Sequence, residues 1–338
     1  MLAIVLASAS IGPALADEPP PGPTAEAIRA GVTRALPLLE KGSAGYVAQR
    51  DCFSCHHQAV PSFALDLARR RGFEVDADNL AEQTELTHSD LSSALDSYKK
   101  GEGQGGGVTR AGYALWMLAL GGHEADEVTG AVAGYILGRE PERGHWRTSS
   151  NRPPSESSPF TTTFVALRGL QAFSPAPEKV RLDERTAKVR AWLEATEPND
   201  NEERVFRLWG LKLAGAASDR VAVASEQLRA RQRPDGGWAQ LDDGTSDAYA
   251  TGSALVALNL GGGVATDDPT YLRGLAYLLA DQREDGSWHV VSRSKPFQPY
   301  FESGFPYGSD QWISSMATGW ATTALALAIE QPAAGQVR

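Results

Sequence analysis

The sequence predicts an all-α protein, an (α/α)6 toroid of about twelve helices in six inner/outer pairs. Apolar residues recur with a period of 3.6 between glycine and proline breakers, and no convincing alternating strand run occurs. The more polar member of each helix pair is followed by a nearly all-apolar one. A helix that is apolar all round must be enclosed by protein. The apolar set therefore belongs inside the ring and the amphipathic set outside.

Six helical hairpins follow one another along the chain. Turn residues separate the two members of each pair, and element boundaries are set by the last periodic residue before such a turn. The expected helices cover residues 26–41, 58–71, 77–100, 109–121, 124–139, 160–173, 183–196, 201–214, 218–232, 249–261, 269–282 and 314–331.

A degenerate repeat marks several of the turns between paired helices. Gln282, Asp285, Gly286 and Trp288 end one copy, and fifty residues upstream Gln232, Asp235, Gly236 and Trp238 hold the same positions. Glycine supplies the turn conformation, aspartate caps the turn or a helix end, and tryptophan fills the groove between adjacent pairs. These residues are predicted to be scaffold rather than chemistry.

The Gln-x-x-x-Gly-x-Trp turns resemble the QW repeats of the squalene–hopene cyclase and prenyltransferase superfamily, over about residues 105–330. The resemblance implies a toroid with a cavity that can hold an apolar ligand. The chain also resembles a group of exported bacterial proteins that join such repeats to a Cys-x-x-Cys-His segment. On this basis residues 17–105 are an N-terminal helical part carrying that segment, and 106–331 are the repeat domain, which is expected to form one continuous toroid with 26–105.

The acids and thiolates of the related enzymes are missing. No Asp-x-Asp-Asp proton-donor cluster occurs, and in Asp247-Ala248-Tyr249 a tyrosine replaces the thiolate of the zinc prenyltransferases. Cyclisation and zinc-dependent prenyl transfer are therefore disfavoured. For a non-standard acid, the residues to mutate first are Asp247, Glu302 and Asp310. Asp247 starts an inner helix, and a plain N-cap is the favoured interpretation of this residue.

The connection from His289 to Gln311 is unusually long and rich in aromatic residues. Loops of this length are uncommon unless they are functional. Two placements stay open at this point: a lid over the cavity mouth, or a loop packed on the outside.

Both cysteines of the chain lie in Cys52-Phe-Ser-Cys55-His56-His57. This spacing is typical of covalent c-type haem attachment, with Cys52 and Cys55 bonded to the haem and His56 on the iron. A Cys52–Cys55 disulfide and a metal site that adds His57 are the alternatives. His88 or His289 is the candidate distal ligand. Because the motif replaces the Gly-x-Trp turn of the first pair, haem is expected at the cavity rim.

Composition limits the partners. The net charge is −10 and no long Lys/Arg run occurs, which disfavours nucleic acid and anionic membranes. The apolar run 2–16 is too short to span a bilayer and ends in a small-x-small pattern, so residues 1–16 are interpreted as a signal peptide, although no Lys or Arg precedes the run. The chain is then periplasmic or secreted, with no transmembrane segment.

These observations predict a haem protein that transfers electrons with a redox partner protein or performs redox chemistry on an apolar small molecule in the cavity. Two alternatives of other classes remain. One is a cofactor-free binding or scaffold toroid with a Cys52–Cys55 disulfide, and the other is a cyclase or lyase with a non-standard acid. Whether the chain is an enzyme stays open.

Overall fold

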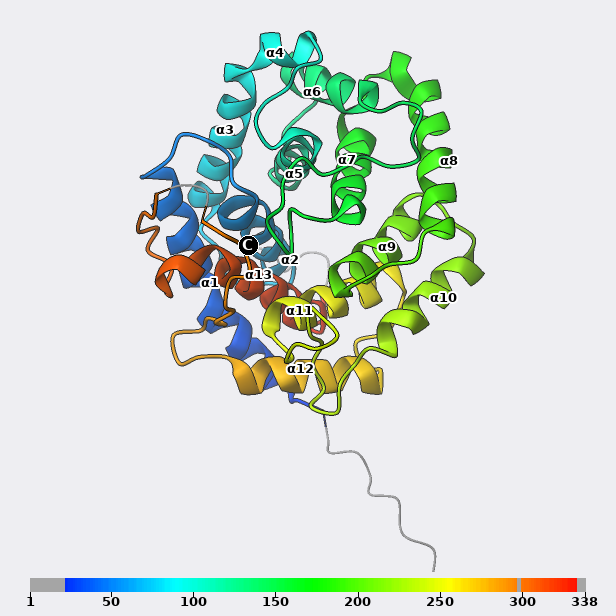
Figure 1. Ribbon diagram of the computed structural model, residues 1–338. Coiled ribbons are helices and arrows are strands. Elements are labelled where there is room, and N and C mark those ends of the chain that lie inside the picture. The colour runs from blue at the N-terminus through cyan, green and yellow to red at the C-terminus, as the bar shows by residue number, and fades with distance from the viewer. Residues whose placement is uncertain (1–21, 297–298, 333–338) are drawn as a thin grey trace, which may run out of the picture.

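The computed structural model describes residues 22–296 and 299–332, and within these ranges it is helical with no strand (Figure 1). The predicted signal peptide, 1–16, lies outside the described residues. Nowhere in the described ranges is a helix both long and apolar enough to cross a membrane. The helices are α1 Ala25–Val47, α2 Val60–Arg70, α3 Ala77–Ser93, α4 Leu95–Lys99, α5 Gly107–Leu120, α6 Glu127–Gly138, α7 Pro159–Phe173, α8 Lys179–Ala195, α9 Asn201–Leu213, α10 Ser218–Arg229, α11 Ala248–Val256, α12 Pro269–Asp281 and α13 Gln311–Leu327.

Each of the twelve expected helices is present, and one of them is split. The helix expected over 77–100 breaks at Ala94, whose backbone leaves the helical region (φ −114°, ψ 18°), and becomes α3 and α4. The described residues therefore hold thirteen α-helices. Short π-helical segments also adjoin two inner helices, Cys55–Ala59 before α2 and Ala257–Gly261 after α11.

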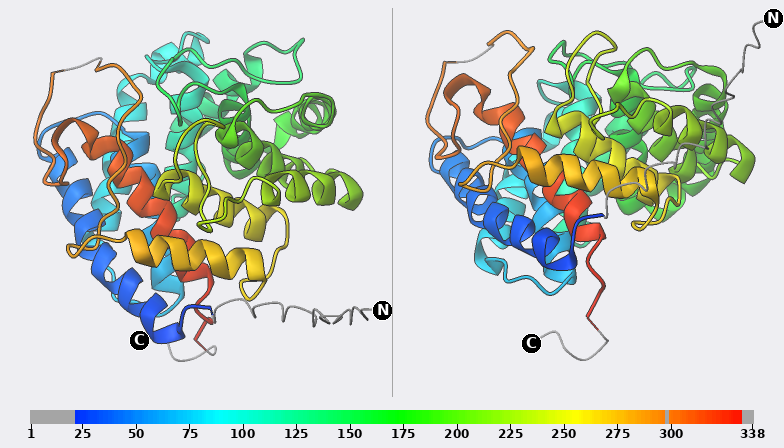
Figure 2. Two further views of the ribbon diagram at one scale, coloured as in Figure 1. Left: turned by 60° about the horizontal axis from the view of Figure 1, so that its bottom comes forward. Right: turned by 90° about the horizontal axis from the view of Figure 1, so that it is seen from below.

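The helices form the predicted toroid of inner and outer helices (Figures 1 and 2). Burial separates the two sets clearly: 16 of the 17 residues of α13 are buried, against three of the 17 of α8. The inner set is α2, α5, α7, α9, α11 and α13, and α13 closes the ring by packing on both α11 and α2. Because α1 packs on α12 and α13, the N-terminal residues belong to the same ring as the repeats.

In three of the pairs a Gly-x-Trp turn joins the outer helix to its inner partner. Trp146, Trp238 and Trp288 are fully buried, and each donates its indole N–H to a carbonyl ten residues earlier at 2.7–2.9 Å. Their backbone N–H groups donate to a threonine hydroxyl on the following inner helix. The expected scaffold role of these turns is thereby explained by specific hydrogen bonds.

The glutamine of the repeat reaches the next outer helix around the ring. Gln232 donates to the carbonyl of Thr270 in α12, and Gln282 donates to the carbonyl of Gly31 in α1, both at 2.8 Å. The same contact is thus used once inside the repeat region and once where the last outer helix meets the first. Gln282 therefore helps to close the outer ring.

Aromatic side chains fill the middle of the toroid. Their ring centroids lie 4.6–6.4 Å apart, in the range of favourable aromatic pairs. They come from five inner helices and are Phe63, Trp116, Phe164, Phe206, Trp209 and Trp320. These rings therefore occupy the place of the open central cavity that the resemblance implies. The two cavities at the cysteine motif lie at one rim.

Two glycines with positive φ, Gly286 and Gly263, differ in how closely other atoms approach them. Gly286 has φ +90°, and a Cβ there would lie 2.2 Å from the carbonyl oxygen of Arg34 in α1. Gly263 has φ +71° with no atom within 4 Å of its Cβ position. We expect Gly263→Ala to lower the free energy of unfolding by about 1–2 kcal/mol through backbone strain alone. Gly286→Ala should lower it by about 1–3 kcal/mol more because it also overpacks the turn.

Denaturant unfolding of the two variants and the wild type measures this difference. Equal losses in both variants would contradict the close approach of the turn to α1.

Candidate functional site

The Cys-x-x-Cys-His-His motif occupies the connection between α1 and α2, at the position where three of the other pairs carry a Gly-x-Trp turn. Ser54 caps the π-helical segment by accepting the backbone N–H of His57 at 3.2 Å. Gln58 accepts the N–H of Ser54 at 2.7 Å, and Ser43 in α1 donates to the carbonyl of His57 at 2.7 Å. These bonds fix the motif between the first outer and inner helices.

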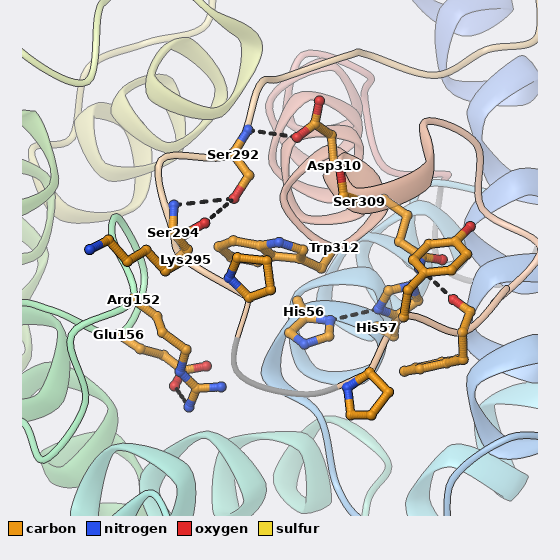
Figure 3. A pocket seen from close by; sticks show the side chains of 15 residues that line it. His56, His57, Arg152, Glu156, Ser292, Ser294, Lys295, Ser309, Asp310 and Trp312 are labelled. Carbon is orange, nitrogen blue, oxygen red and sulfur yellow. Dashed lines mark hydrogen bonds and ion pairs between the residues drawn. The ribbon is translucent and has the colours of Figure 1, made fainter.

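Two adjacent cavities meet at the motif. The larger, about 670 Å³, is lined by Cys52, Cys55 and His56 together with the N-terminal end of α5. The smaller, about 270 Å³, is lined by His56, His57, the start of α13 and the long connection before it (Figure 3). Both are bounded by His56, Arg152, Glu156, Lys295 and Pro296. The histidine that follows the second cysteine thus stands between the two hollows.

The two thiols point to different partners. Cys55 is buried and its thiol donates to Oε1 of Glu156 at 2.9 Å, while Cys52 Sγ lies 3.4 Å from the hydroxyl of Tyr46. Both cysteines are free. Burial, and then the neighbouring Glu156, raise the pKa of Cys55 well above its usual value, so it stays a neutral thiol. The Glu156 carboxylate is also paired with Arg152.

The two histidines are hydrogen-bonded to each other, and one ring nitrogen of the pair is left without a partner among the described residues. Nδ1 of His56 and Nδ1 of His57 are 2.6 Å apart, and Nε2 of His57 is 2.9 Å from the hydroxyl of Ser303. Nε2 of His56 has no hydrogen-bond partner among the described residues. Burial lowers the pKa of His56, and it lowers that of His57 to about 3, so both rings are neutral near pH 7. A neutral imidazole with a free nitrogen is the form that binds a metal.

Three cationic side chains line the larger cavity, and two of them are already paired. Arg110 makes two bonds to Asp90, at 2.6 and 2.7 Å, and Arg152 is paired with Glu156. Lys295 makes no ion pair within the described part of the chain. The wall therefore presents one unneutralised cation, which suits a ligand with a carboxylate.

The acids singled out from the sequence lie apart from one another. Asp310 lines the smaller cavity and accepts from the N–H of Ser292 at 2.9 Å. Glu302 is exposed and is held by Tyr300 and Gly304, outside both cavities.

Asp247 is the N-cap of α11, accepting the N–H of Ala250 at 2.9 Å. It also accepts from Gln240, and burial raises its pKa to about 6. The capping role expected for Asp247 is confirmed, and its side chain belongs to neither cavity lining.

The two candidate distal histidines are both engaged elsewhere. The ring of His289 stacks on Tyr307 at 4.3 Å, and its Nε2 lies 3.1 Å from Asp310. Asp310 lines the smaller cavity, whereas His289 does not. His88, the other candidate distal ligand, instead places Nε2 2.7 Å from Asp126, the N-cap of α6. The structure therefore does not bring His88 to the motif.

The long connection lines the smaller cavity rather than packing on the outside. Pro296, Pro299, Tyr300 and Phe301 contribute to that lining, which is one of the two placements left open by the sequence. Phe297, another aromatic of this segment, lies outside the described residues.

The structure adds a buried acid that the sequence reasoning missed. Glu202, in the first turn of α9, accepts from Thr161 at 2.9 Å and from the hydroxyl of Tyr249 at 3.1 Å. Burial raises its pKa to about 8, so it is largely protonated at neutral pH. Tyr113 lies nearby, its hydroxyl has no partner in the described structure, and burial, followed by Glu202, raises its pKa. In the sequence, Glu202-Glu203 resembles an ordinary acidic first turn, and only its place on an inner helix hints at burial.

Comparisons with known proteins support the fold. No family model and no curated protein sequence matches the chain. Among solved structures, the type II terpene cyclase MstE from Scytonema is similar with a TM-score of 0.55 and 15% identity, over 90% of this chain and 98% of that one. An unsaturated glucuronyl hydrolase from Bacillus sp. GL1 is similar with a TM-score of 0.54 and 12% identity, over 88% of this chain and 96% of that one. A protein from Actinoplanes gives 0.56 and 12%, over 88% of this chain and 100% of the other. At these identities the likeness establishes a terpene-cyclase-like α/α toroid and nothing finer.

Glu202 predicts a specific pH dependence of stability. The folded chain keeps a proton on Glu202 up to about pH 8, whereas the unfolded chain releases it near pH 4.3. Between these values the unfolded state binds fewer protons, so this group lowers the free energy of unfolding as pH rises, by at most about 1.4 kcal/mol per pH unit. Glu202→Gln removes this contribution, so the stability of the wild type relative to the variant should fall between pH 5 and pH 8.

Chemical denaturation at several pH values measures this relative stability. Glu184→Gln, at an exposed position of α8, is the control and should leave the profile unchanged. Parallel profiles for the wild type and Glu202→Gln would show that Glu202 is already ionised in the folded protein.

Proposed function

We propose that the chain is a terpene-cyclase-like toroid that carries one covalent c-type haem at the rim and serves in electron transfer or redox chemistry. One observation carries the proposal. The two free thiols of the Cys-x-x-Cys-His motif and the following histidine line a single cavity of about 670 Å³. This volume lies within the range of cofactor sites in proteins.

The residues present fit a haem. Thioether formation at Cys55 would remove its hydrogen bond to Glu156, but the carboxylate would keep its pairing with Arg152. Tyr46, Phe53 and Tyr113 supply aromatic surface in the same lining, and Lys295 offers a cation for a haem carboxylate. No buried charge would be left unpaired by the modification.

The side chains of the motif would hold the haem iron in the following way. His56 would bind the iron through Nε2, which has no hydrogen-bond partner among the described residues. His57 holds Nδ1 of His56, and Ser303 in turn holds Nε2 of His57. Burial keeps both imidazoles neutral, and Nε2 of His56 carries no proton in the tautomer in which its Nδ1–H donates to His57. The haem itself would supply one-electron chemistry. The smaller cavity on the other side of His56 is then available to an apolar small molecule.

The other interpretations of the motif receive less support. A redox-active disulfide needs an accessible thiolate of lowered pKa, whereas Cys55 is buried and its pKa is raised. For a metal site, ligand atoms must converge. The group of histidine, cysteine and acidic ligand atoms that does converge in the described residues lies elsewhere and contains no cysteine. The proposal also includes export, through the predicted signal peptide 1–16, and a redox partner protein outside the cell membrane.

Covalent haem is the direct test. Residues 17–338, fused to an export signal in a bacterial host that attaches haem c, should yield protein with a reducible Soret band. The band should survive denaturation and acid–acetone extraction, and the intact mass should increase by one haem. Cys52→Ala/Cys55→Ala should abolish attachment because both thioether bonds are lost.

His145→Ala is the matched control, since His145 stacks on Trp192 away from the motif and should not affect haem content. His56→Ala should leave the thioether bonds intact but change the Soret spectrum. A folded wild-type chain without covalent haem, in a host that loads a reference cytochrome c, would overturn the proposal.

A cyclase-like enzyme is the second candidate, and Glu202 is the observation that favours it. A carboxylic acid kept protonated near neutral pH is a suitable proton donor, and the similar MstE is a type II terpene cyclase. If this candidate holds, Cys52→Ser/Cys55→Ser should keep its activity toward an isoprenoid substrate, whereas Glu202→Gln should lose about 100-fold or more. Product formation followed by mass spectrometry decides this, with Glu184→Gln as control. Activity that survives Glu202→Gln, or no product from any form, removes the second candidate.

A further inference from the structure

A second cluster of potential ligands lies away from the cysteine motif. Nε2 of His88 is 2.7 Å from Oδ2 of Asp126, and Nε2 of His123 is 3.4 Å from the same oxygen. The ligand atoms of these three residues lie within 4.8 Å of one another. We propose that His88, His123 and Asp126 form a binding site for a divalent transition metal such as Zn²⁺.

Two segments of the chain, α3 and the connection between α5 and α6, place these side chains. His88 projects from α3, His123 lies in the turn after α5, and Asp126 is the N-cap of α6. Two imidazoles and one carboxylate converging in this way are the donor set that suits zinc and related metals. A bound ion would join an outer helix to the connection between the next inner and outer helices.

The carboxylate of Asp126 is already oriented. Its Oδ1 accepts from the backbone N–H of Thr129 at 2.8 Å and from the Thr129 hydroxyl at 2.9 Å. This leaves Oδ2 directed at both histidines. Fixed outer partners of this kind are what hold metal-binding carboxylates in place.

Nε2 of both histidines faces the same carboxylate oxygen, Oδ2 of Asp126. In the absence of metal, both histidines must carry a proton on Nε2 to donate to one carboxylate oxygen. A divalent ion would instead be coordinated by both imidazoles and the carboxylate, with water as the fourth ligand. The side chains are 22, 25 and 36% exposed, so an ion can reach them.

The cluster is independent of the haem proposal. Gly106, Thr109 and Arg110, at the N-terminal end of α5, line the larger cavity, whereas His123 follows the C-terminal end of that helix. A helix of 14 residues is about 21 Å long, so the two sites are well separated. Each can be removed without the other.

Zinc titration tests the site directly. The chain bearing Cys52→Ser/Cys55→Ser is used so that thiolates cannot take the metal, and Zn²⁺ binding is measured by calorimetry. Visible absorption of bound Co²⁺ then reports the ligand set. One Zn²⁺ should bind per chain, and His88→Ala, His123→Ala and Asp126→Asn should each weaken it by at least about tenfold, the loss seen even for outer-shell residues.

Two variants guard against a misfolded protein. Asp126→Asn keeps a good N-cap for α6 while removing the carboxylate. His145→Ala, a histidine outside the cluster, should leave zinc affinity unchanged. No zinc binding by the parent chain, or binding that persists unchanged in the three ligand variants, would overturn the proposal.

Discussion

The aromatic cluster on the ring axis is the contact on which the rest of the toroid depends. Five of the six inner helices each place at least one ring in it, and Trp116 alone contacts rings from α2, α7, α9 and α13. Each such pair contributes about 0.5–1.5 kcal/mol beyond the burial of its area. Because these rings fill the middle, the inner helices cannot surround a large ligand there. The two cavities that meet at the cysteine motif lie at the rim instead.

The rim site occupies the connection of the first pair, which lacks the Gly-x-Trp turn. In three pairs a tryptophan indole and a threonine hydroxyl join the outer to the inner helix. In the first pair Tyr46 stacks on His57 at 5.5 Å, and Ser43 bonds to the carbonyl of the same histidine. His57 thus takes over the structural task of the missing tryptophan. This frees Cys52, Cys55 and His56 to line the cavity.

Periodicity and repeats were sufficient to predict the toroid, because inner helices must be apolar all round and the turn residues recur. The break at Ala94 was not predictable, since no glycine or proline marks it. The cysteine motif was found by its spacing, but its partner Glu156 is 101 residues away and no local pattern announces it. His88 was misplaced for a similar reason. The direction of a half-buried side chain depends on a neighbouring helix, here through Asp126.

Burial decides the charge of the site. It favours the neutral imidazoles of His56 and His57, the neutral thiol of Cys55 and, deeper in the ring, the protonated acid of Glu202. The ionised groups at the cavity wall are mostly paired, as with Arg110 and Asp90. A neutral interior with one remaining cation, Lys295, at its edge disfavours a highly charged ligand, because desolvating such charges without partners is costly. It suits a large apolar ring that carries its carboxylates toward the rim, which is the chemical character of haem.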